Sequence, residues 1–211
     1  RRGSRTGSLQ SLIYEKTMPS ISGQTKLIGL LGQPVNHSIS PVIHNAALEE
    51  MGLDWCYVAM SCNTANISIV LKGLRNLDFQ GLNITIPHKK LVAKECVSLS
   101  NIAEKIGAVN TLLPANEESW EGTNTDIEGF LAPLKRKSFS NNFALIIGCG
   151  GSAKAVAAGL IELGFKEITI IGRDDKKLKS FIKELTIAYH QAKEKTTILN
   201  PLISSDLKII Q

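Results

Sequence analysis

The sequence predicts an α/β protein in which an N-terminal α/β domain (residues 24–125) is followed by a Rossmann-type domain (residues 126–211) that is incomplete at its C-terminus. Two observations support this prediction. Short apolar segments alternate with segments of helical apolar spacing, which is typical of strands connected by helices. In addition, the glycine-rich turn G-C-G-G at 148–151 lies directly between an apolar strand and a helix of small residues. The 211 residues suffice for two small domains with hydrophobic cores.

In the N-terminal domain, each expected element follows from local signals. An apolar strand ends in a glycine turn, and Ser40 with Pro41 then predicts a helix that begins with a serine N-cap and ends at Gly52. Later segments alternate in the same way, and a polar loop is expected at 116–121. The expected strands are Lys26–Gly32, Trp55–Met60, Gly81–Ile86 and Gly107–Leu113, and the expected helices are 40–51, Ile67–Leu74 and Lys90–Ser98.

In the second domain, Thr125 and Glu128 form a capping-box pattern that predicts a helix from about residue 125 to Lys137. The unbroken apolar run Phe143–Ile147 is typical of a strand buried in a parallel sheet. The segments that follow are a helix over Ser152–Leu163 closed by Gly164, a strand over Glu167–Ile171 and an amphipathic helix over about 175–192. Because helices connect the strands, we expect parallel strands with right-handed crossovers.

The composition is that of an ordinary globular protein. Hydrophobic residues make up 43% of the chain and charged residues 20%, and the net charge is +5. Because the basic residues form no long run, we expect no nucleic-acid partner, although a mild positive field suits an anionic ligand. No apolar run approaches the ~20 residues of a membrane span, so no membrane partner is expected. The 4 cysteines show no C-x-x-C pairing, which predicts neither a zinc site nor disulfides and favours a cytoplasmic location.

The two ends of the chain carry weaker signals. Residues 1–17 are polar and unpatterned, with Glu15 as their only acid, and Met18 precedes the first clear strand. This segment can be interpreted as an Arg/Ser-rich transit peptide, which would indicate a plastid, or, as we prefer, as residues added upstream of a natural start. At the other end, residues 206–211 resemble a buried strand that stops midway, so we expect the chain to be a fragment.

The glycine turn predicts a nucleotide site. Gly148 permits a tight turn, Gly150 lets the backbone approach a pyrophosphate, and the small Ala153 lets the helix pack closely on the strand. The helix N-terminus would then offer unpaired N–H groups to the phosphates. The alternative is a turn that serves packing alone.

The end of the following strand indicates which dinucleotide is bound. An NAD site usually has Asp or Glu there, to bind the ribose 2′-hydroxyl. This chain has Gly172 and Arg173, with Lys176 and Lys177 in the next turn. Glycine leaves room and arginine offers a planar fork for a 2′-phosphate, so we expect NADP, although two aspartates weaken the positive field. The alternative for Arg173 is a solvated loop charge.

Two residues are suited to proton transfer. Pro87 is expected to start a helix with Lys89 in its first turn, after a strand on which Asn83 and Thr85 share one face. Asp126 lies in the first turn of another helix, where it would orient the Lys89 amine if the fold brings the two together. Each residue also has an ordinary explanation, because a lysine beside another lysine is usually solvated and an aspartate at a helix start usually interacts with the helix dipole.

Ser38 and Ser40 place two hydroxyls at the junction between a loop and a helix. Together with the N–H groups of the helix N-terminus they could bind a small carboxylate. Composition alone favours the simpler interpretation of a serine N-cap and one surface serine. His37 and His44 have no carboxylate or cysteine near them in the sequence, so no metal site is expected.

Five stretches of the sequence, in register, resemble the shikimate dehydrogenase family. They are G-Q-P-V-N-H-S-I-S-P-V-I-H-N (32–45), N-I-T-I-P-H-K (83–89), G-A-V-N-T (107–111), G-T-N-T-D (122–126) and G-C-G-G-S-A-K-A (148–155). The resemblance implies an NADP-dependent oxidoreductase that reversibly reduces 3-dehydroshikimate to shikimate, in aromatic amino-acid (chorismate) biosynthesis. It also implies an active site in the cleft between the domains, in a monomer or a homodimer.

The same resemblance implies roles for individual residues. Ser38 and Ser40 would bind the substrate carboxylate, and Thr85, Asn110 and Asp126 would hydrogen-bond the ring hydroxyls and the carbonyl region. Lys89 would be the catalytic proton donor, assisted by Asp126. The cofactor would be held by Gly148, Gly150, Gly151, Ser152, Ala153, Arg173 and Lys177, with Arg173 and Lys177 on the 2′-phosphate.

Two departures from the family pattern keep alternatives open. The family commonly has Asn-Arg-Thr where this chain has Gly172-Arg173-Asp174, which puts the cofactor affinity in question, and the family continues beyond Gln211. The alternative enzymes are a quinate/shikimate or an aminoshikimate dehydrogenase. A non-catalytic shikimate-binding relative is a further alternative, although such a protein would not need the Lys89–Asp126 pair.

Overall fold

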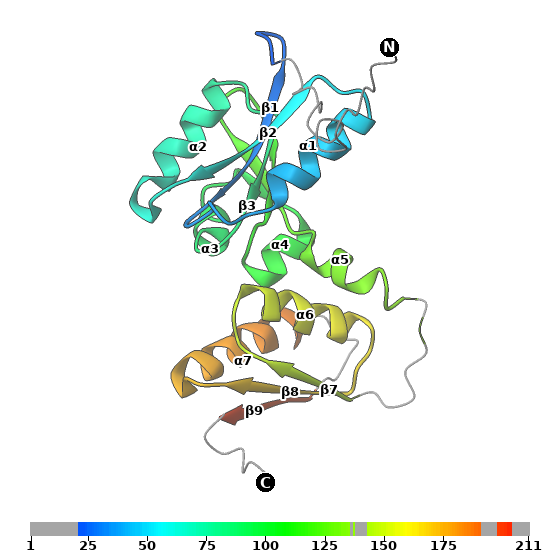
Figure 1. Cartoon of the computed structure of the whole chain (residues 1–211). Helices are drawn as coiled ribbons and strands as arrows, with labels where there is room; N and C mark the ends of the chain where they lie inside the picture. Colours follow the sequence, from blue (N-terminus) through cyan, green and yellow to red (C-terminus); the bar gives the residue numbers. More distant parts are fainter. Residues whose placement is uncertain (1–20, 136, 138–142, 191–197, 204–211) are drawn as a thin grey trace, which may run out of the picture.

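The computed structural model describes residues 21–135, 137, 143–190 and 198–203, which form two α/β domains, one above the other in Figure 1. The strands are β1 (Lys26–Gly32), β2 (Trp55–Ser61), β3 (Gly81–Ile84), β4 (Ser98–Leu99), β5 (Thr111–Pro114), β6 (Trp120–Thr123), β7 (Phe143–Ile147), β8 (Glu167–Gly172) and β9 (Ile198–Ile203). The helices are α1 (Ser40–Glu50), α2 (Ile67–Asn76), α3 (Lys89–Val92), α4 (Asn101–Ile106), α5 (Asp126–Leu131), α6 (Gly151–Glu162) and α7 (Asp175–His190). The predicted α/β class is confirmed.

The sheet of the first domain is mixed, which corrects the expectation that all strands are parallel. Its order is β2-β1-β3-β5-β6-β4, and β1 runs parallel to β2 and β3, whereas β5 is antiparallel to β3 and β6. β6 runs back along β5 after a tight connection, in which the Asn116 side chain accepts from the backbone N–H groups of Glu118 and Ser119. β6 therefore begins at Trp120, inside the segment expected to be a polar loop.

The sheet of the second domain is parallel throughout, in the order β7-β8-β9. Its first two strands and the helix between them were predicted. β9 was not predicted, and the strand expected at 206–211 lies outside the described residues, as do residues 1–17.

Several predicted helix ends are wrong. α1 begins at Ser40, so Ser40 is its first helical residue and not its N-cap. The N-cap is Ile39, whose apolar side chain cannot accept a hydrogen bond, and the Ser40 backbone N–H donates to Ser38 Oγ (3.2 Å). The capping box at Thr125 does not form either, since α5 has no side-chain cap. α5 ends at Leu131 and α3 at Val92, both earlier than predicted, and α4 was missed.

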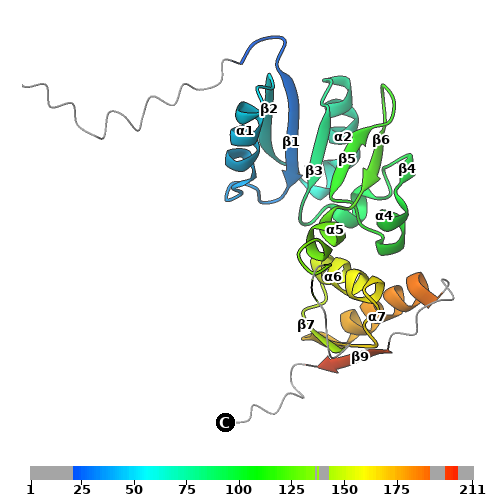
Figure 2. The same cartoon turned by 90° about the vertical axis from the view of Figure 1, so that its right-hand side faces the viewer.

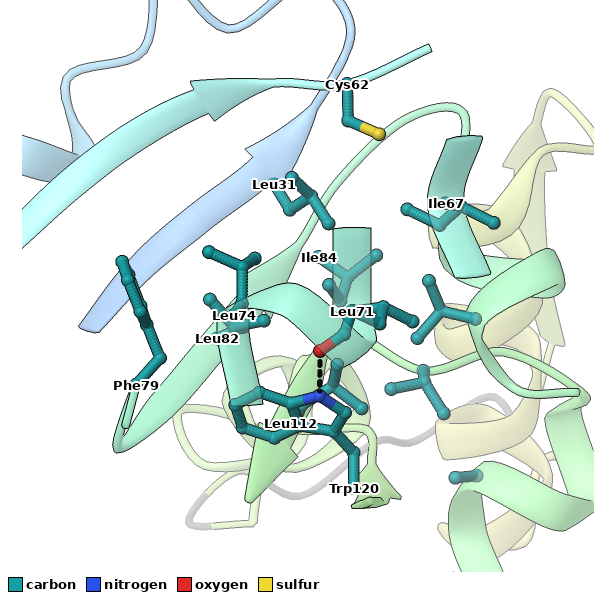
Figure 3. Close-up of a cluster of buried hydrophobic side chains, with 13 residues drawn as sticks. Leu31, Cys62, Ile67, Leu71, Leu74, Phe79, Leu82, Ile84, Leu112 and Trp120 are labelled. Atoms are coloured by element: carbon teal, nitrogen blue, oxygen red, sulfur yellow. Dashed lines mark hydrogen bonds between the residues drawn. The ribbon is translucent and has the colours of Figure 1, made fainter. Parts of the chain in front are cut away.

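The core of the first domain lies between its sheet and α2. Figure 3 shows Leu82, Ile84 and Leu112 of the sheet packed against Leu71 of α2, and the Trp120 indole N–H donates to the Leu71 carbonyl oxygen (2.9 Å). Burial of these side chains supplies the main stabilising free energy of the domain. Side chains alternate between the two faces of a sheet along each strand. Leu30 of β1 and Tyr57 of β2 therefore pack on the opposite face of the sheet, towards α1.

Helices α4, α5, α6 and α7 join the two domains (Figures 1 and 2). α6 is made largely of small residues, and a side chain at Gly159 would lie 3.2 Å from Leu131 of α5. This glycine therefore lets α5 approach α6 closely. A shared cluster that includes Ile127, Leu131 and Ala158 is buried at the junction, so the residues that follow Asp126 pack directly on the second domain.

Candidate functional site

Lys89 and Asp126, 37 positions apart in the sequence, form an ion pair. Lys89 Nζ donates to Asp126 Oδ2 at 2.7 Å, and the two side chains are 19% and 30% exposed. A half-buried pair keeps a defined geometry while one side of the amine stays accessible to a ligand. The predicted approach of these two side chains is therefore observed.

The backbone around Lys89 explains its position. His88 is fully buried, and its Nε2 lies 2.9 Å from the Cys62 carbonyl oxygen, which anchors the start of α3 beyond the end of β2. The Val109 N–H donates to the Lys89 carbonyl oxygen (2.9 Å) and thereby brings the segment that contains Asn110 alongside.

Asn110 orients Asp126. Asn110 Nδ2 donates to Asp126 Oδ1 (2.6 Å) and to Thr125 Oγ1 (3.1 Å), while Asn110 Oδ1 accepts from the Thr125 backbone N–H (3.0 Å). The contact with Asn110 occupies the Thr125 hydroxyl, which is the physical reason that the predicted capping box is absent. Asn124 Oδ1 accepts from the Asp126 backbone N–H instead.

The predicted carboxylate-binding serines lie where the β1–α1 loop enters α1. Ser38 and Ser40 are both partly buried, and the Ser40 side chain acts to lower the pKa of the Tyr57 phenol, so it faces that hydroxyl. Thr85 lies directly after β3, and its methyl group occupies the space that a side chain at Gly32 would need. The Gln33 N–H also donates to the Ile86 carbonyl oxygen (2.9 Å). The start of the β1–α1 loop, which we call the serine loop, therefore lies against the segment that contains Thr85 and Ile86.

A row of hydrogen-bonded side chains that the sequence did not reveal crosses the sheet to this pair. The Tyr57 hydroxyl donates to Asn83 Oδ1 (2.8 Å), Asn83 Nδ2 to Thr111 Oγ1 (3.4 Å), and Thr111 Oγ1 to Asn110 Oδ1 (2.9 Å). We call this set the polar row; its members are Tyr57, Asn83, Thr111, Asn110, Asp126 and Lys89. Of these, Tyr57 and Thr111 had no predicted role. Thr111 ends the quoted motif at 107–111, whereas Tyr57 of β2 lies outside all five quoted stretches, so no motif marked it.

The glycine turn lies at the carboxyl end of β7, before α6. Gly148 has a φ of 110°, which side-chain-bearing residues rarely adopt. A Cβ built at Gly148, Gly150 or Gly151 meets no atom within 4 Å, so the backbone there faces open space. Ser152 is exposed in the first turn of α6, and Ala153 packs on the domain core as predicted. This arrangement suits a phosphate group at the helix N-terminus.

Arg173 follows β8 directly and is exposed, as is Lys177. The two aspartates that follow are engaged with α7: Asp174 Oδ1 accepts from the Lys177 N–H (3.0 Å), and Asp175 pairs with Lys179 (2.7 Å). Within the described part of the chain, no hydrogen bond or ion pair occupies the Arg173 side chain. The arginine is therefore free to bind an anionic group.

A second ion cluster joins the two domains. Glu184 of α7 accepts from Lys154 (2.7 Å) and from Lys90 (3.2 Å), and the Lys154 side chain is only 6% exposed. Burial acts to raise the pKa of Glu184, but the hydrogen bonds and charges of the two lysines outweigh it, so the pKa is lowered. Because Lys90 follows Lys89 and Lys154 lies in the first turn of α6, Glu184 connects the two predicted sites.

A pocket of about 620 Å³ lies at this junction and differs from the predicted substrate site. It is lined by Asn101, Glu104, Lys105, Gly107, Lys154, Glu184, Ile187 and Ala188. No member of the polar row lines it. The convergence of Lys89, Asp126 and Asn110 is better evidence for chemistry than this pocket, because it joins specific groups at hydrogen-bonding distance.

The described residues carry neither a candidate metal cluster nor a helix able to span a membrane. The described residues contain no group of three or more His, Cys, Asp or Glu side chains placed to hold a metal ion. Within the same residues, none of the helices combines the length and the apolar character that crossing a membrane requires.

Two family models match the chain. One, described as "Shikimate dehydrogenase substrate binding domain", matches residues 30–112, and the other, "Shikimate / quinate 5-dehydrogenase", matches residues 131–209. The predicted domain boundary between 125 and 126 falls between the two matched ranges and stays a prediction.

Relatives and solved structures agree with this match. A protein of Synechocystis sp. named shikimate dehydrogenase (NADP(+)) is 47% identical over 171 residues, which cover 80% of this chain and 59% of the relative. Shikimate 5-dehydrogenase from Listeria monocytogenes, in complex with shikimate and NAD, has a TM-score of 0.77 and 29% identity, covering 90% of this chain and 65% of that chain. The enzyme from Thermus thermophilus, in complex with NADP(H) and shikimate, has a TM-score of 0.70 and 32% identity, covering 84% and 62%. The chain thus spans less than two thirds of the length of these proteins.

Proposed function

The chain belongs to the shikimate dehydrogenase family, and on that basis we propose that the protein reversibly reduces 3-dehydroshikimate to shikimate with NADPH. The observation that carries this proposal is the 2.7 Å pair of Lys89 and Asp126, two residues of separate quoted motifs that meet in one site. Reduction of a carbonyl requires a proton for the oxygen, and a positioned lysine can supply it.

Lys89 is the proposed proton donor. As the carbonyl carbon of the substrate is reduced, negative charge develops on the oxygen, and Lys89 Nζ transfers a proton to it. Asp126 holds the amine through Oδ2, and Asn110 holds Asp126 through Oδ1, so the lysine is oriented before the substrate arrives. In the reverse direction the same amine accepts the proton.

Ser38 and Ser40 are the proposed ligands of the substrate carboxylate, and Thr85 and Asn110 the proposed partners of its ring oxygens. Support comes from the packing of the serine loop against the Thr85 segment and from the polar row, which links Ser40 through Tyr57 to Asn110. A rigid row that spans the site would fix the distance between the carboxylate end and the reacting end of a ring acid.

The cofactor NADP fits the second domain. The open backbone at Gly150 and Gly151 and the exposed Ser152 suit a pyrophosphate, and Arg173, which no described group engages, suits a 2′-phosphate together with Lys177. NADPH, when bound, supplies the hydride. The domain boundary after residue 125, a cytoplasmic location and a monomeric or homodimeric state belong to the same proposal and rest on the sequence.

The test is a steady-state assay of the purified protein that contains this chain. We expect loss of NADPH absorbance with 3-dehydroshikimate, and formation of NADPH from shikimate and NADP. Shikimate, quinate and an amino analogue should be compared, each with NADP and with NAD. Turnover that is faster with quinate, or with NAD, would replace the proposal by the quinate alternative, which the name of the second family model also includes. Binding of shikimate without any turnover would favour the non-catalytic relative.

A further inference from the structure

Tyr57 reaches across a whole strand of the first sheet. It projects from β2, and its hydroxyl donates to Asn83 of β3, although β1 lies between these strands. Strands lie roughly 4.8 Å apart, so this contact spans roughly 10 Å, which requires a long and rigid side chain. The ring packs over Leu30 of β1 on the way and is only 3% exposed.

Two consecutive residues of α1 hold Tyr57 in this position. The His44 ring stacks on the Tyr57 ring, with centroids 4.2 Å apart and planes within 3° of parallel. The Asn45 side chain donates to the Tyr57 carbonyl oxygen (2.9 Å) and accepts from its N–H (2.8 Å). Both residues end the motif quoted at 32–45, and neither has a part in the chemistry proposed above.

The direction of the hydrogen bonds in the polar row is fixed from one end. The backbone N–H of Thr125 can only donate, so the oxygen of Asn110 must face it. The Thr111 hydroxyl then donates to the same oxygen, and Asn83 must turn its NH2 group towards Thr111. The Asn83 carbonyl oxygen consequently faces Tyr57.

The other end of the row agrees with this direction. Burial raises the pKa of Tyr57 to about 12, and the Ser40 side chain lowers it only in part. The phenol therefore keeps its proton at working pH and donates to Asn83. Asn83 is left with one amide hydrogen that no described group accepts.

We propose that Tyr57, held by His44 and Asn45, is a positioning residue that fixes the Asn83 amide so that it offers an N–H group to an oxygen of the bound ring acid. The inference rests on the proposed function and deepens it. A ligand that presents an accepting hydroxyl or carbonyl oxygen at this point is favoured, whereas one that presents an apolar edge leaves the amide hydrogen unpaired and binds more weakly.

The test is calorimetric binding of shikimate to four proteins: wild type, Tyr57→Phe, Asn83→Ala and the double variant. Tyr57→Phe removes only the hydroxyl, and we expect the shikimate Kd to rise about tenfold while the Kd of NADP changes less than about twofold. In the Asn83→Ala background the same change should have no further effect, since the tyrosine acts through the asparagine. Losses that multiply in the double variant, or an unchanged Kd in Tyr57→Phe, would overturn the proposal.

Tyr189→Phe is the matched control, because the Tyr189 hydroxyl of the second domain is buried and has no hydrogen-bond partner among the described residues. It should leave the shikimate Kd unchanged. If Tyr57→Phe does not fold, Thr111→Val serves as the second variant, because it removes the other hydrogen-bond partner of Asn83 and should also weaken shikimate binding. Thr111→Ser keeps the hydroxyl and should bind shikimate as wild type does. Equal shikimate binding by Thr111→Val and Thr111→Ser would overturn the proposal.

Failure of this inference is distinct from failure of the proposed function. Wild-type protein that binds shikimate without turnover defeats the proposed function, yet the binding cycle still tests Tyr57. Wild-type protein that binds no shikimate defeats both.

Discussion

The polar row of the first domain and the nucleotide corner of the second (Gly148–Ala153 with Arg173 and Lys177) are built in opposite ways. In the polar row, each side chain already has a partner within the protein, from Tyr57 to the Lys89–Asp126 pair. In the nucleotide corner, the glycines face open space and Arg173 is exposed. The first site is thus organised by the fold, and the second offers groups that no described residue engages and that a ligand could bind.

This difference separates the roles of the two regions. Groups that are held in place before binding contribute to catalysis, because little reorganisation is needed in the transition state. Exposed groups contribute binding free energy when an anion pairs with them. Variants in the polar row should therefore change turnover or substrate affinity, and variants in the corner should change cofactor affinity.

The largest effect is expected from Lys89→Ala. Loss of the proposed proton donor should lower kcat by about 10³-fold, with little change in the Kd of shikimate. The measurement is steady-state kinetics combined with calorimetry. Lys94→Ala is the matched control, since Lys94 is exposed and lies in the segment after α3. A kcat unchanged by Lys89→Ala would remove the polar row from the chemistry and end the contrast between the two regions.

The next effect is expected from Arg173→Ala. The KM for NADP should rise roughly tenfold, because the proposed charge-assisted hydrogen bond to the 2′-phosphate is lost, while the KM for NAD and the kcat stay close to the wild-type values. Lys183→Ala, an exposed cation on the same domain, serves as the control. Equal changes with NADP and NAD would show that Arg173 does not distinguish the two cofactors.

A stability experiment sharpens the comparison at Gly148. Alanine there would have to adopt a φ of 110°, so Gly148→Ala should lower the free energy of unfolding by about 1–2 kcal/mol. The measurement is the urea midpoint at constant slope. Gly73→Ala in α2 is the control, because its Cβ would also meet open space and alanine favours a helix, so that variant should be neutral or more stable. Equal destabilisation of both variants would contradict the conformational argument.

The sequence predicted the second domain more completely than the connections of the first. β7, α6 and β8 follow one another with short turns, and local patterns determine each of them. The strand expected at Gly107–Leu113 overlaps β5 (Thr111–Pro114), but β6 was missed because its turn and the buried Trp120 lie in a polar segment, and only pairing with other strands makes that segment extended.

The site shows the same division. Residue type and motif identified Lys89 and Asp126, but the contacts that orient them come from side chains on separate strands. Thr125 illustrates the limit: its spacing to Glu128 predicts a capping box, yet Asn110, brought alongside by the Lys89–Val109 backbone contact, competes for its hydroxyl. A cross-strand contact of this kind leaves no periodic signal in the sequence.

The smallest expected effect tests the link between the two regions. The lysines Lys90 and Lys154 lower the folded-state pKa of Glu184 overall, so the ion cluster stabilises the fold above the unfolded-state pKa of about 4.3. This contribution is lost as the pH falls through the lowered folded-state value. Because Glu184 is partly exposed, Glu184→Gln should cost no more than about 1 kcal/mol of unfolding free energy at about pH 7.

As the pH falls through the lowered folded-state pKa of Glu184, the wild-type carboxylate gains a proton, and the difference between Glu184→Gln and wild type should shrink towards zero. The measurement is urea unfolding over a series of pH values from neutral downwards, and Glu121→Gln, an exposed acid of β6, is the control. The Glu184 carboxylate contacts both Lys90, which is next to Lys89, and Lys154, which lies in the first turn of α6. If these contacts also hold α6 against α3, Glu184→Gln should raise the KM for NADP and lower kcat together. A stability loss without any kinetic change would show that Glu184 joins the domains but does not align the two sites.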